Sequence, residues 1–218
     1  MAKKKTITSS DILGAYMKYV LEHGEHPKSI YAFAQILDIN ETHIYDNYGS
    51  FEAIEKSIFK TFYDNTISLL DKNLEYQTFD TKNRLLSFYY TFFEELKANR
   101  SYVVYALANK KNKLKVLSTL SSLKKAFLGY IEDIDIDTLD LADANMGKLK
   151  NRGIAELAWG QLLFTLKFWL EDDSTGFEKT DIFIEKSITT GFAMLDTTIL
   201  KSVFDLGKFL IKEKMYTY

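Results

Sequence analysis

Residues 29–54, SIYAFAQILDINETHIYDNYGSFEAI, contain the most informative pattern of this 218-residue chain. Ser29 and Asn40 are good N-caps for two short helices, and Ser50 is a good N-cap for a longer third helix. Asp38 lies in the tight turn that is expected between the two short helices. Two short helices joined by a tight turn and followed by a longer helix are typical of a helix-turn-helix module.

The helical pattern continues on both sides of this stretch. Ser9 or Ser10 is expected to cap a first helix that ends at Gly24. Apolar residues at helical spacing predict further helices over residues 51–76, 82–97, 101–110, 114–131, 153–170 and 177–214. The chain has only one proline and ten glycines, whereas β-sandwiches and barrels need turn residues about every eight to twelve positions. The sequence therefore predicts an all-α fold, with a helix-turn-helix domain over residues 1–55 and a larger helical domain over residues 56–218.

Composition excludes several classes of protein. The chain has no cysteine, so disulfide scaffolds and cysteine-ligated metal sites are excluded. The most apolar segment, residues 157–170, is interrupted by Gln161 and Lys167 and is too short to span a bilayer. Lys3, Lys4 and Lys5 precede polar residues where a signal peptide needs an apolar stretch. We therefore expect a cytoplasmic protein without a membrane span.

Two acidic or histidine-rich segments resemble metal sites only superficially. His23 and His26 are three residues apart in a predicted loop, without a second cluster of ligands. The segment that begins at Asp133 has Thr138 and Ala144 where a calcium loop needs glycine and glutamate. No P-loop, nucleophile elbow or dinucleotide fingerprint is present. The sequence predicts no catalytic residues, no metal and no cofactor.

The order and spacing of sixteen N-terminal residues point to a family. They are Ile12, Leu13, Tyr19, Gly24, Ser29, Ile30, Phe33, Ala34, Ile39, Asn40, Ile44, Tyr45, Tyr48, Ser50, Ala53 and Ile54. This pattern, within residues 10–59, resembles the N-terminal domain of the TetR (tetracycline-repressor-like) family of bacterial transcription regulators. Farther on, Trp169, the run Asp172-Asp173-Ser174 and the long last helix are similar to the closing helix pair of that family.

The resemblance implies that residues 41–47 form a recognition helix in the major groove of double-stranded DNA. Ile44 would anchor this helix to the core, and Tyr45 and Tyr48 would brace it and touch phosphates. The same residues are also consistent with a role in closing the three-helix core alone, and we favour that role for Ile44 and Tyr48. The candidate DNA-binding residues are Lys3, Lys4, Lys5, Lys28, Thr42, His43, Tyr45, Asp46, Asn47 and Tyr48.

The chain departs from the family in three ways. Phe51 stands where the family usually has a lysine that contacts phosphate, and Asp38 stands where it usually has the glycine of the turn. Aspartate tolerates the left-handed conformation better than most residues, so we expect the turn to form. The third departure is charge, because residues 6–55 carry two lysines, no arginine and eight carboxylates, a formal net charge of −6. A module that docks on phosphates is usually basic.

Aromatic residues make up 15% of the chain and are abundant in the second domain. The resemblance implies a ligand pocket there, and aromatic side chains with few polar groups suit an apolar or amphipathic small molecule. The same residues are equally consistent with a well-filled core. The candidate ligand-binding residues are Tyr89, Phe93, Tyr105, Phe127, Trp159 and Phe164.

An apolar stripe at helical spacing runs from Ile184 to Leu210 over about seven turns. The predicted helix over residues 153–170 spans only about five turns and is too short to cover this stripe. Two copies of the helix pair would close a four-helix bundle, as the family does. The candidate residues of this homodimer interface are Ile188, Phe192, Leu195, Ile199 and Val203.

Two functions are consistent with these patterns. The first is a dimeric repressor that binds DNA through the helix-turn-helix and responds to a small apolar or amphipathic ligand. The alternative is a protein that keeps this fold, has lost DNA binding and acts as a lipid-binding or interaction protein. Phe51 and the acidic first domain favour the alternative.

Overall fold

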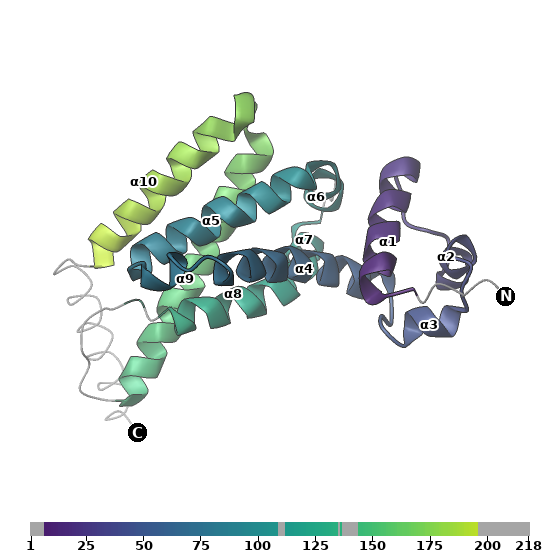
Figure 1. The fold of residues 1–218 in the computed structure, drawn as a ribbon, viewed down its shortest axis with the longest axis horizontal. Coiled ribbons are helices and arrows are strands. Elements are labelled where there is room, and N and C mark those ends of the chain that lie inside the picture. Colours follow the sequence, from purple (N-terminus) through teal and green to yellow (C-terminus); the bar gives the residue numbers. More distant parts are fainter. Residues whose placement is uncertain (1–6, 109–111, 135, 137–143, 196–218) are drawn as a thin grey trace, which may run out of the picture. The chain divides into compact units, whose positions relative to one another are not determined.

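A computed structural model describes residues 7–108, 112–134, 136 and 144–195. Within these residues the regular elements are all helices, as Figure 1 shows, which confirms the predicted all-α fold. The chain forms two compact units. The first contains Met1–Leu69 and Thr91–Phe127, and the second contains Leu70–Tyr90 and Leu128–Tyr218.

The helices are short in the N-terminal part of the chain and longer afterwards. They are α1 (Ser9–His23), α2 (Ile30–Ile36), α3 (Glu41–Tyr45), α4 (Phe51–Asp71), α5 (Thr81–Ala98), α6 (Arg100–Leu107), α7 (Lys113–Thr119), α8 (Ser121–Asp133), α9 (Ala144–Glu171) and α10 (Glu178–Leu195), with short 3-10 turns at Tyr76–Thr78 and Thr175–Phe177. The predicted domain boundary after residue 55 lies inside α4. Every helix in the described part of the chain is too short or too polar to cross a membrane.

The ends of the first helices follow the predicted capping residues closely. Ser29 and Asn40 cap α2 and α3 through their side chains, and Gly24 ends α1 in the left-handed conformation at φ 73°. The cap of α1 is Thr8 and not Ser9 or Ser10. Thr8 forms a capping box with Asp11, in which each side chain accepts a hydrogen bond from the backbone of the other residue.

Three of the predicted helices differ from the observed ones. The predicted helix over residues 51–76 ends at Asp71. The predicted helix over residues 114–131 is divided at Leu120 into α7 and α8. The predicted helix over residues 153–170 begins nine residues earlier, at Ala144, and continues through the glycines that weaken helix propensity. Its 28 residues make about eight turns. The helix is thus longer than the five turns predicted for it, and residues 196–210 of the predicted apolar stripe lie outside the described residues.

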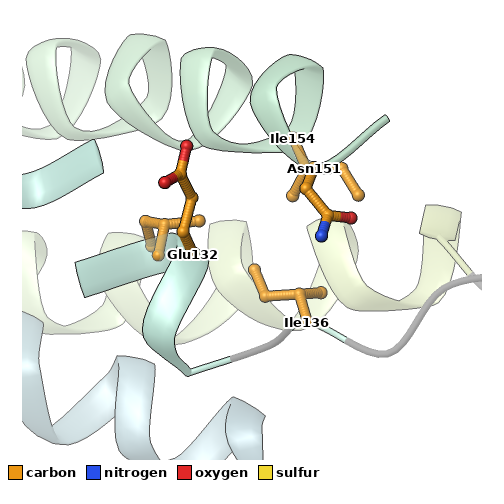
Figure 2. Close-up of a pocket in the computed structure, with 5 residues that line it drawn as sticks. Glu132, Ile136, Asn151 and Ile154 are labelled. Atoms are coloured by element: carbon orange, nitrogen blue, oxygen red, sulfur yellow. The ribbon is translucent and has the colours of Figure 1, made fainter. Parts of the chain in front are cut away.

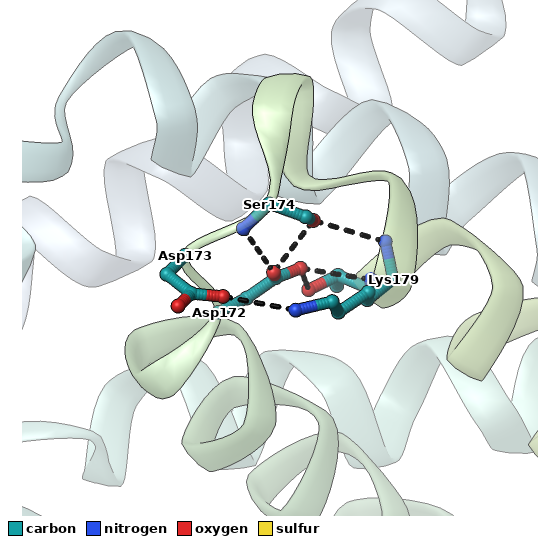
Figure 3. Close-up of polar contacts among 5 residues, drawn as sticks. Asp172, Asp173, Ser174 and Lys179 are labelled. Atoms are coloured by element: carbon teal, nitrogen blue, oxygen red, sulfur yellow. Dashed lines mark hydrogen bonds and ion pairs between the residues drawn. The ribbon is translucent and has the colours of Figure 1, made fainter.

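The connection between α9 and α10 is built around the buried carboxylate of Asp172, shown in Figure 3. One carboxylate oxygen accepts hydrogen bonds from the backbone N–H and the hydroxyl of Ser174, at 2.9 and 2.6 Å. The other oxygen accepts from the backbone N–H and the hydroxyl of Thr180, at 2.9 and 2.6 Å. Burial alone would raise the pKa of Asp172, but these four donors outweigh it and lower the pKa to about 2.

Replacing Asp172 with alanine should lower the free energy of unfolding by about 2 to 3 kcal/mol, because four donors lose a charged acceptor. The pKa of the carboxyl is below the 3.8 of an ordinary aspartate, so its stabilising contribution is complete above about pH 4 and is lost as the pH falls towards 2. Chemical denaturation between neutral pH and pH 3 measures both effects.

The neighbouring Asp173 is a matched control for this substitution. It forms an exposed ion pair with Lys179 at 2.9 Å, and exposed pairs contribute little. Asp173→Ala should therefore leave both the free energy of unfolding and its pH dependence nearly unchanged. Equal destabilisation by the two substitutions would contradict a special role for Asp172.

Candidate functional site

The turn between α2 and α3 depends on one residue in a left-handed conformation. Asp38 has a φ of 53°, as the sequence predicted for this turn. The backbone then reverses, and the N–H of Ile39 donates to the carbonyl of Ala34 at 3.1 Å. Asn40 follows, and its side-chain oxygen accepts from the N–H and the hydroxyl of Thr42, both at 3.0 Å. These bonds set where α3 begins.

The surface of α3 is only partly available to a partner. Ile44 is fully buried and anchors the helix to the core, as predicted. Thr42, Tyr45, Asp46 and Asn47 are exposed, and half of the Tyr45 side chain is accessible. These four candidates therefore share one short exposed segment, which carries one formal negative charge and no positive charge.

His43 and Tyr48 are used inside the unit. His43 is half-buried, and its Nε2 hydrogen-bonds to the carbonyl oxygen of Ile7 at 2.9 Å, so this nitrogen carries the proton. Tyr48 is buried, and its hydroxyl hydrogen-bonds to the hydroxyl of Ser9. Both bonds hold the segment before and at the start of α1 beside α3. The two side chains therefore position the N-terminal segment, and their roles as DNA contacts stay predictions.

Phe51 lies in an aromatic cluster of the helix-turn-helix. Its ring stacks on Tyr16 with centroids 5.6 Å apart, and it meets Phe33 edge-on at 6.1 Å. His26 lies 5.5 Å away on the connection between α1 and α2. The side chain thus packs the start of α4 against α1 and α2. A position where the family places a phosphate-binding lysine is therefore a packing position in this chain.

A buried carboxylate lies next to this cluster. Glu55 is only 7% exposed and accepts a hydrogen bond from the hydroxyl of Tyr16 at 3.2 Å. Burial, together with the nearby Glu55 carboxylate, raises the pKa of Tyr16 far above its ordinary value. Tyr16 therefore stays neutral and holds the start of α4 against α1.

Few cations accompany the exposed face of α3. Lys28 is exposed just before α2, and Lys60 on α4 is paired with Asp64, with its Nζ 2.5 and 2.7 Å from the two carboxylate oxygens. Lys3, Lys4 and Lys5 lie outside the described residues. The described part of the module does not supply the basic surface that phosphate contacts require.

The second unit contains a pocket of about 330 Å³. Its lining is almost entirely apolar, with Gln161 and Ser187 as the polar side chains. The lining residues are Leu85, Ile136, Ile154, Leu157, Ala158, Gln161, Ser187, Ile188, Gly191, Phe192, Met194 and Leu195. An apolar pocket of about 300 Å³ or more with a few polar groups is typical of small-molecule sites. We call it the α9–α10 pocket, because most of its lining comes from these two helices.

A smaller hollow of about 10 Å³ adjoins the α9–α10 pocket, and the two share Ile136 and Ile154. Figure 2 shows Glu132, at the end of α8, and Asn151, on α9, beside these two isoleucines. Both polar side chains belong to exposed residues. This end of the pocket therefore has an acidic border.

The predicted ligand-binding residues do not line the α9–α10 pocket. Phe164 is exposed, Tyr105 is half-buried, and the other four, Tyr89, Phe93, Phe127 and Trp159, are buried. One of them, Tyr89, reaches the pocket indirectly, because its hydroxyl hydrogen-bonds to Gln161. The role of these six residues in binding stays a prediction.

Three of the predicted interface residues do line the α9–α10 pocket. Ile188 is buried there, and Phe192 and Leu195 are half-buried. Ile199 and Val203 lie outside the described residues. The predicted interface and the pocket therefore overlap on α10.

Two residues that line the pocket, Gln161 and Gly191, are distinctive in the sequence but were not among the predicted ligand-binding residues. Gln161 interrupts the most apolar segment of the chain, and Gly191 lies in the apolar stripe of α10. A Cβ added at Gly191 would meet open space, so the glycine leaves part of the pocket empty. The sequence did not show that these two positions lie on facing helices.

Comparisons with known proteins agree with this architecture. Residues 84–210 match the family model described as "Tetracyclin repressor-like, C-terminal domain". The solved structure of the fatty acid degradation regulator FadR from Bacillus halodurans is similar, with a TM-score of 0.54 and 18% sequence identity over 85% of this chain and 96% of that chain. At this identity the likeness concerns the fold. No curated protein matches the chain.

The left-handed turn gives a test of the helix-turn-helix in solution. Asp38→Gly should maintain or raise the free energy of unfolding, because glycine adopts a φ of 53° without steric cost. Asp46 has an ordinary φ of −61°, so Asp46→Gly should lower the free energy of unfolding by about 0.5 to 1 kcal/mol. Thermal and chemical denaturation measure both variants. Similar destabilisation by the two glycines would show that the turn differs in solution.

Proposed function

Because the chain belongs to the TetR (tetracycline-repressor-like) family of transcription regulators, we propose that it is a dimeric DNA-binding repressor controlled by a small apolar or amphipathic ligand. The observation that carries the proposal is the helix-turn-helix geometry together with the family match over residues 84–210. The first unit would read DNA and the second would bind the ligand and a second copy of the chain.

The DNA-binding half of the proposal is supported by the surface of α3. Thr42 and Asn47 are exposed polar side chains that suit base edges, and Tyr45 is an exposed aromatic side chain suited to the backbone. The bond between His43 and Ile7 brings the N-terminal segment to α3. Lys3, Lys4 and Lys5 precede that segment in the sequence, so the tail would supply positive charge that the described part of α3 lacks.

The dimer is supported by apolar side chains that α9 leaves exposed. Leu157 is 70% exposed and Phe164 is 59% exposed. The two are seven residues apart, so they lie on the same face of the helix. Monomeric proteins rarely expose extended apolar patches, and a second copy of the helix pair would cover this face.

The ligand would control DNA affinity through the dimer. A regulator of this kind binds two half-sites with two recognition helices, and its affinity depends on their spacing. The α9–α10 pocket overlaps the predicted interface at Ile188, Phe192 and Leu195. A molecule in the pocket would therefore change the interface and, with it, the spacing of the two α3 helices.

A second candidate function has an observation of its own. Phe51 packs in the core of the helix-turn-helix at a position where the family usually has a lysine, so the chain has no cation there. Residues 6–55 carry a formal charge of −6. Both features favour a protein that has lost DNA binding and acts through its ligand or through another protein. Selection of DNA fragments from a random pool by the purified full chain distinguishes the two functions. An enriched sequence with two related half-sites supports the repressor, and no enrichment supports the second candidate.

Replacing Lys3, Lys4 and Lys5 with alanine should weaken binding to every DNA sequence. Each phosphate contact that is lost should reduce the slope of log affinity against log salt concentration by about 0.9. Fluorescence anisotropy at several salt concentrations measures this slope. A matched variant replaces Lys72, Lys167 and Lys186, three exposed lysines of the second unit, and should bind as the wild type does. Unchanged affinity and slope in the first variant would show that Lys3, Lys4 and Lys5 do not contact DNA.

Phe164→Glu should convert the dimer into a folded monomer. The side chain is already 59% exposed, so the substitution should spare the fold of one copy while placing a charge in the proposed interface. Sedimentation velocity measures the mass, and circular dichroism checks the helices. Leu114→Glu is the control, since Leu114 is a 76% exposed apolar residue on α7. A Phe164→Glu variant that remains a dimer would place the interface on another surface.

A further inference from the structure

The α9–α10 pocket reaches from the surface into the helical core. Four of its lining residues, Leu85, Ile136, Ile154 and Ile188, are at most 9% exposed and come from α5, the segment after α8, α9 and α10. Leu157 on α9 and Met194 on α10 are 70% and 59% exposed. The pocket therefore has a buried floor formed by four segments and an exposed apolar rim. This depth is expected of a site for a small molecule more than of a flat helix face.

The polar side chains at the pocket donate their hydrogens to other groups of the protein. The Nε2 group of Gln161 donates to the hydroxyls of Thr165 and Ser187, at 3.0 and 2.9 Å. The hydroxyl of Ser187 donates to the carbonyl of Ile184 at 3.2 Å, and the hydroxyl of Thr165 donates to the carbonyl of Gln161 at 3.0 Å.

Tyr89 completes this network. Its hydroxyl donates to Oε1 of Gln161, and burial raises its pKa, so the hydroxyl keeps its proton. The lone pairs that remain belong to oxygens of Gln161 and Ser187, the two polar side chains that line the pocket. The polar part of the pocket can therefore accept a hydrogen bond from a ligand, and each of its hydrogens is already donated to a protein oxygen in this structure.

The charges around the pocket also favour a ligand head group that donates a hydrogen bond over an anionic one. Among the described residues, none of the lining side chains is charged, and the adjoining hollow adds the carboxylate of Glu132 and the side-chain amide of Asn151. A ligand carboxylate or phosphate beside Gln161 and Ser187 would find neither a cation nor an unused donor among the described lining side chains, which is costly. A hydroxyl or an amine there would meet the acceptor oxygens of Gln161 and Ser187.

From this arrangement we infer that the α9–α10 pocket binds an amphiphile with an apolar chain and a head group that donates a hydrogen bond, of the alcohol or amine class, and that it rejects the matching carboxylate. The inference rests on the proposed function of the second unit as the ligand-binding part of the regulator. It goes further by naming the head group and the side chains that select it, Gln161 and Ser187.

A pair of probes that differ only in the head group tests this selection. Isothermal calorimetry of the full chain at neutral pH, without DNA, should give n-decanol an affinity at least roughly tenfold higher than decanoate. Equal affinities, or tighter binding of decanoate, would overturn the inference.

A pair of glycine substitutions locates the binding. Gly191 lines the pocket, and a Cβ there meets open space, so Gly191→Leu fills the pocket while improving helix propensity. It should weaken n-decanol binding by roughly tenfold or more. Gly160→Leu on α9 is the matched control, since Gly160 also has open space around it but does not line the pocket. Equal effects of the two variants would mean that the alcohol binds elsewhere.

A charge introduced at the polar end should reverse the selection. Ser187→Lys places a donor and a positive charge beside Gln161, so decanoate should bind this variant more tightly than n-decanol does. An unchanged preference for the alcohol would show that Ser187 does not contact the head group, and it would overturn the assignment.

The same variants separate this inference from the proposed function. If Gly191→Leu changes the sedimentation of the chain and leaves n-decanol affinity unchanged, a second copy occupies the pocket and the inference is wrong. If n-decanol binds with the stated preference but does not change DNA affinity, the inference is supported and the proposed control of DNA binding fails. If n-decanol does not bind while DNA binding is intact, the inference alone fails.

Discussion

The contact of Phe51 with Tyr16, Phe33 and His26 is the interaction on which the arrangement of the helix-turn-helix depends. One ring joins the start of α4 to α1, to α2 and to the connection between them. Because these three helices are held together, the turn at Asp38 determines where α3 lies relative to them. The same contact has a cost for nucleic-acid binding, because an aromatic side chain cannot neutralise a phosphate. At this position the chain therefore has a packing contact and no positive charge.

In the second unit a comparable role belongs to Asp172. By binding Thr180 it fixes the first turn of α10, and Ser187 lies seven residues, or about two turns, farther along the same face. The rotation of α10 that lets Ser187 reach Gln161 is therefore determined at the helix start. The hydrogen bond between Gln161 and Ser187 therefore depends on the hydrogen bonds of Asp172 at the start of α10.

The parts of the fold that could be predicted are those with local causes. The caps Ser29 and Asn40 and the left-handed Asp38 act within a few residues, and the structure has all three as the sequence indicated. The break at Leu120 could not be predicted this way, because Leu120 is buried and tertiary packing overrides helix propensity there. The start of α9 at Ala144 was missed because Gly147 and Gly153 lower the helix propensity of this stretch. The pocket was missed for a similar reason, since it is formed by residues of α5, α9 and α10 that are far apart in the sequence.

The hydrogen bond from His43 to Ile7 has a practical consequence for anyone who handles this protein. It fixes the N-terminal segment beside α3, and six residues can extend by no more than about 20 Å. Anything joined to the first residue, such as an affinity tag or a fluorescent label, would remain within reach of the exposed side chains of α3. A tag or label joined at that position would therefore compete with any partner for the exposed side chains of α3.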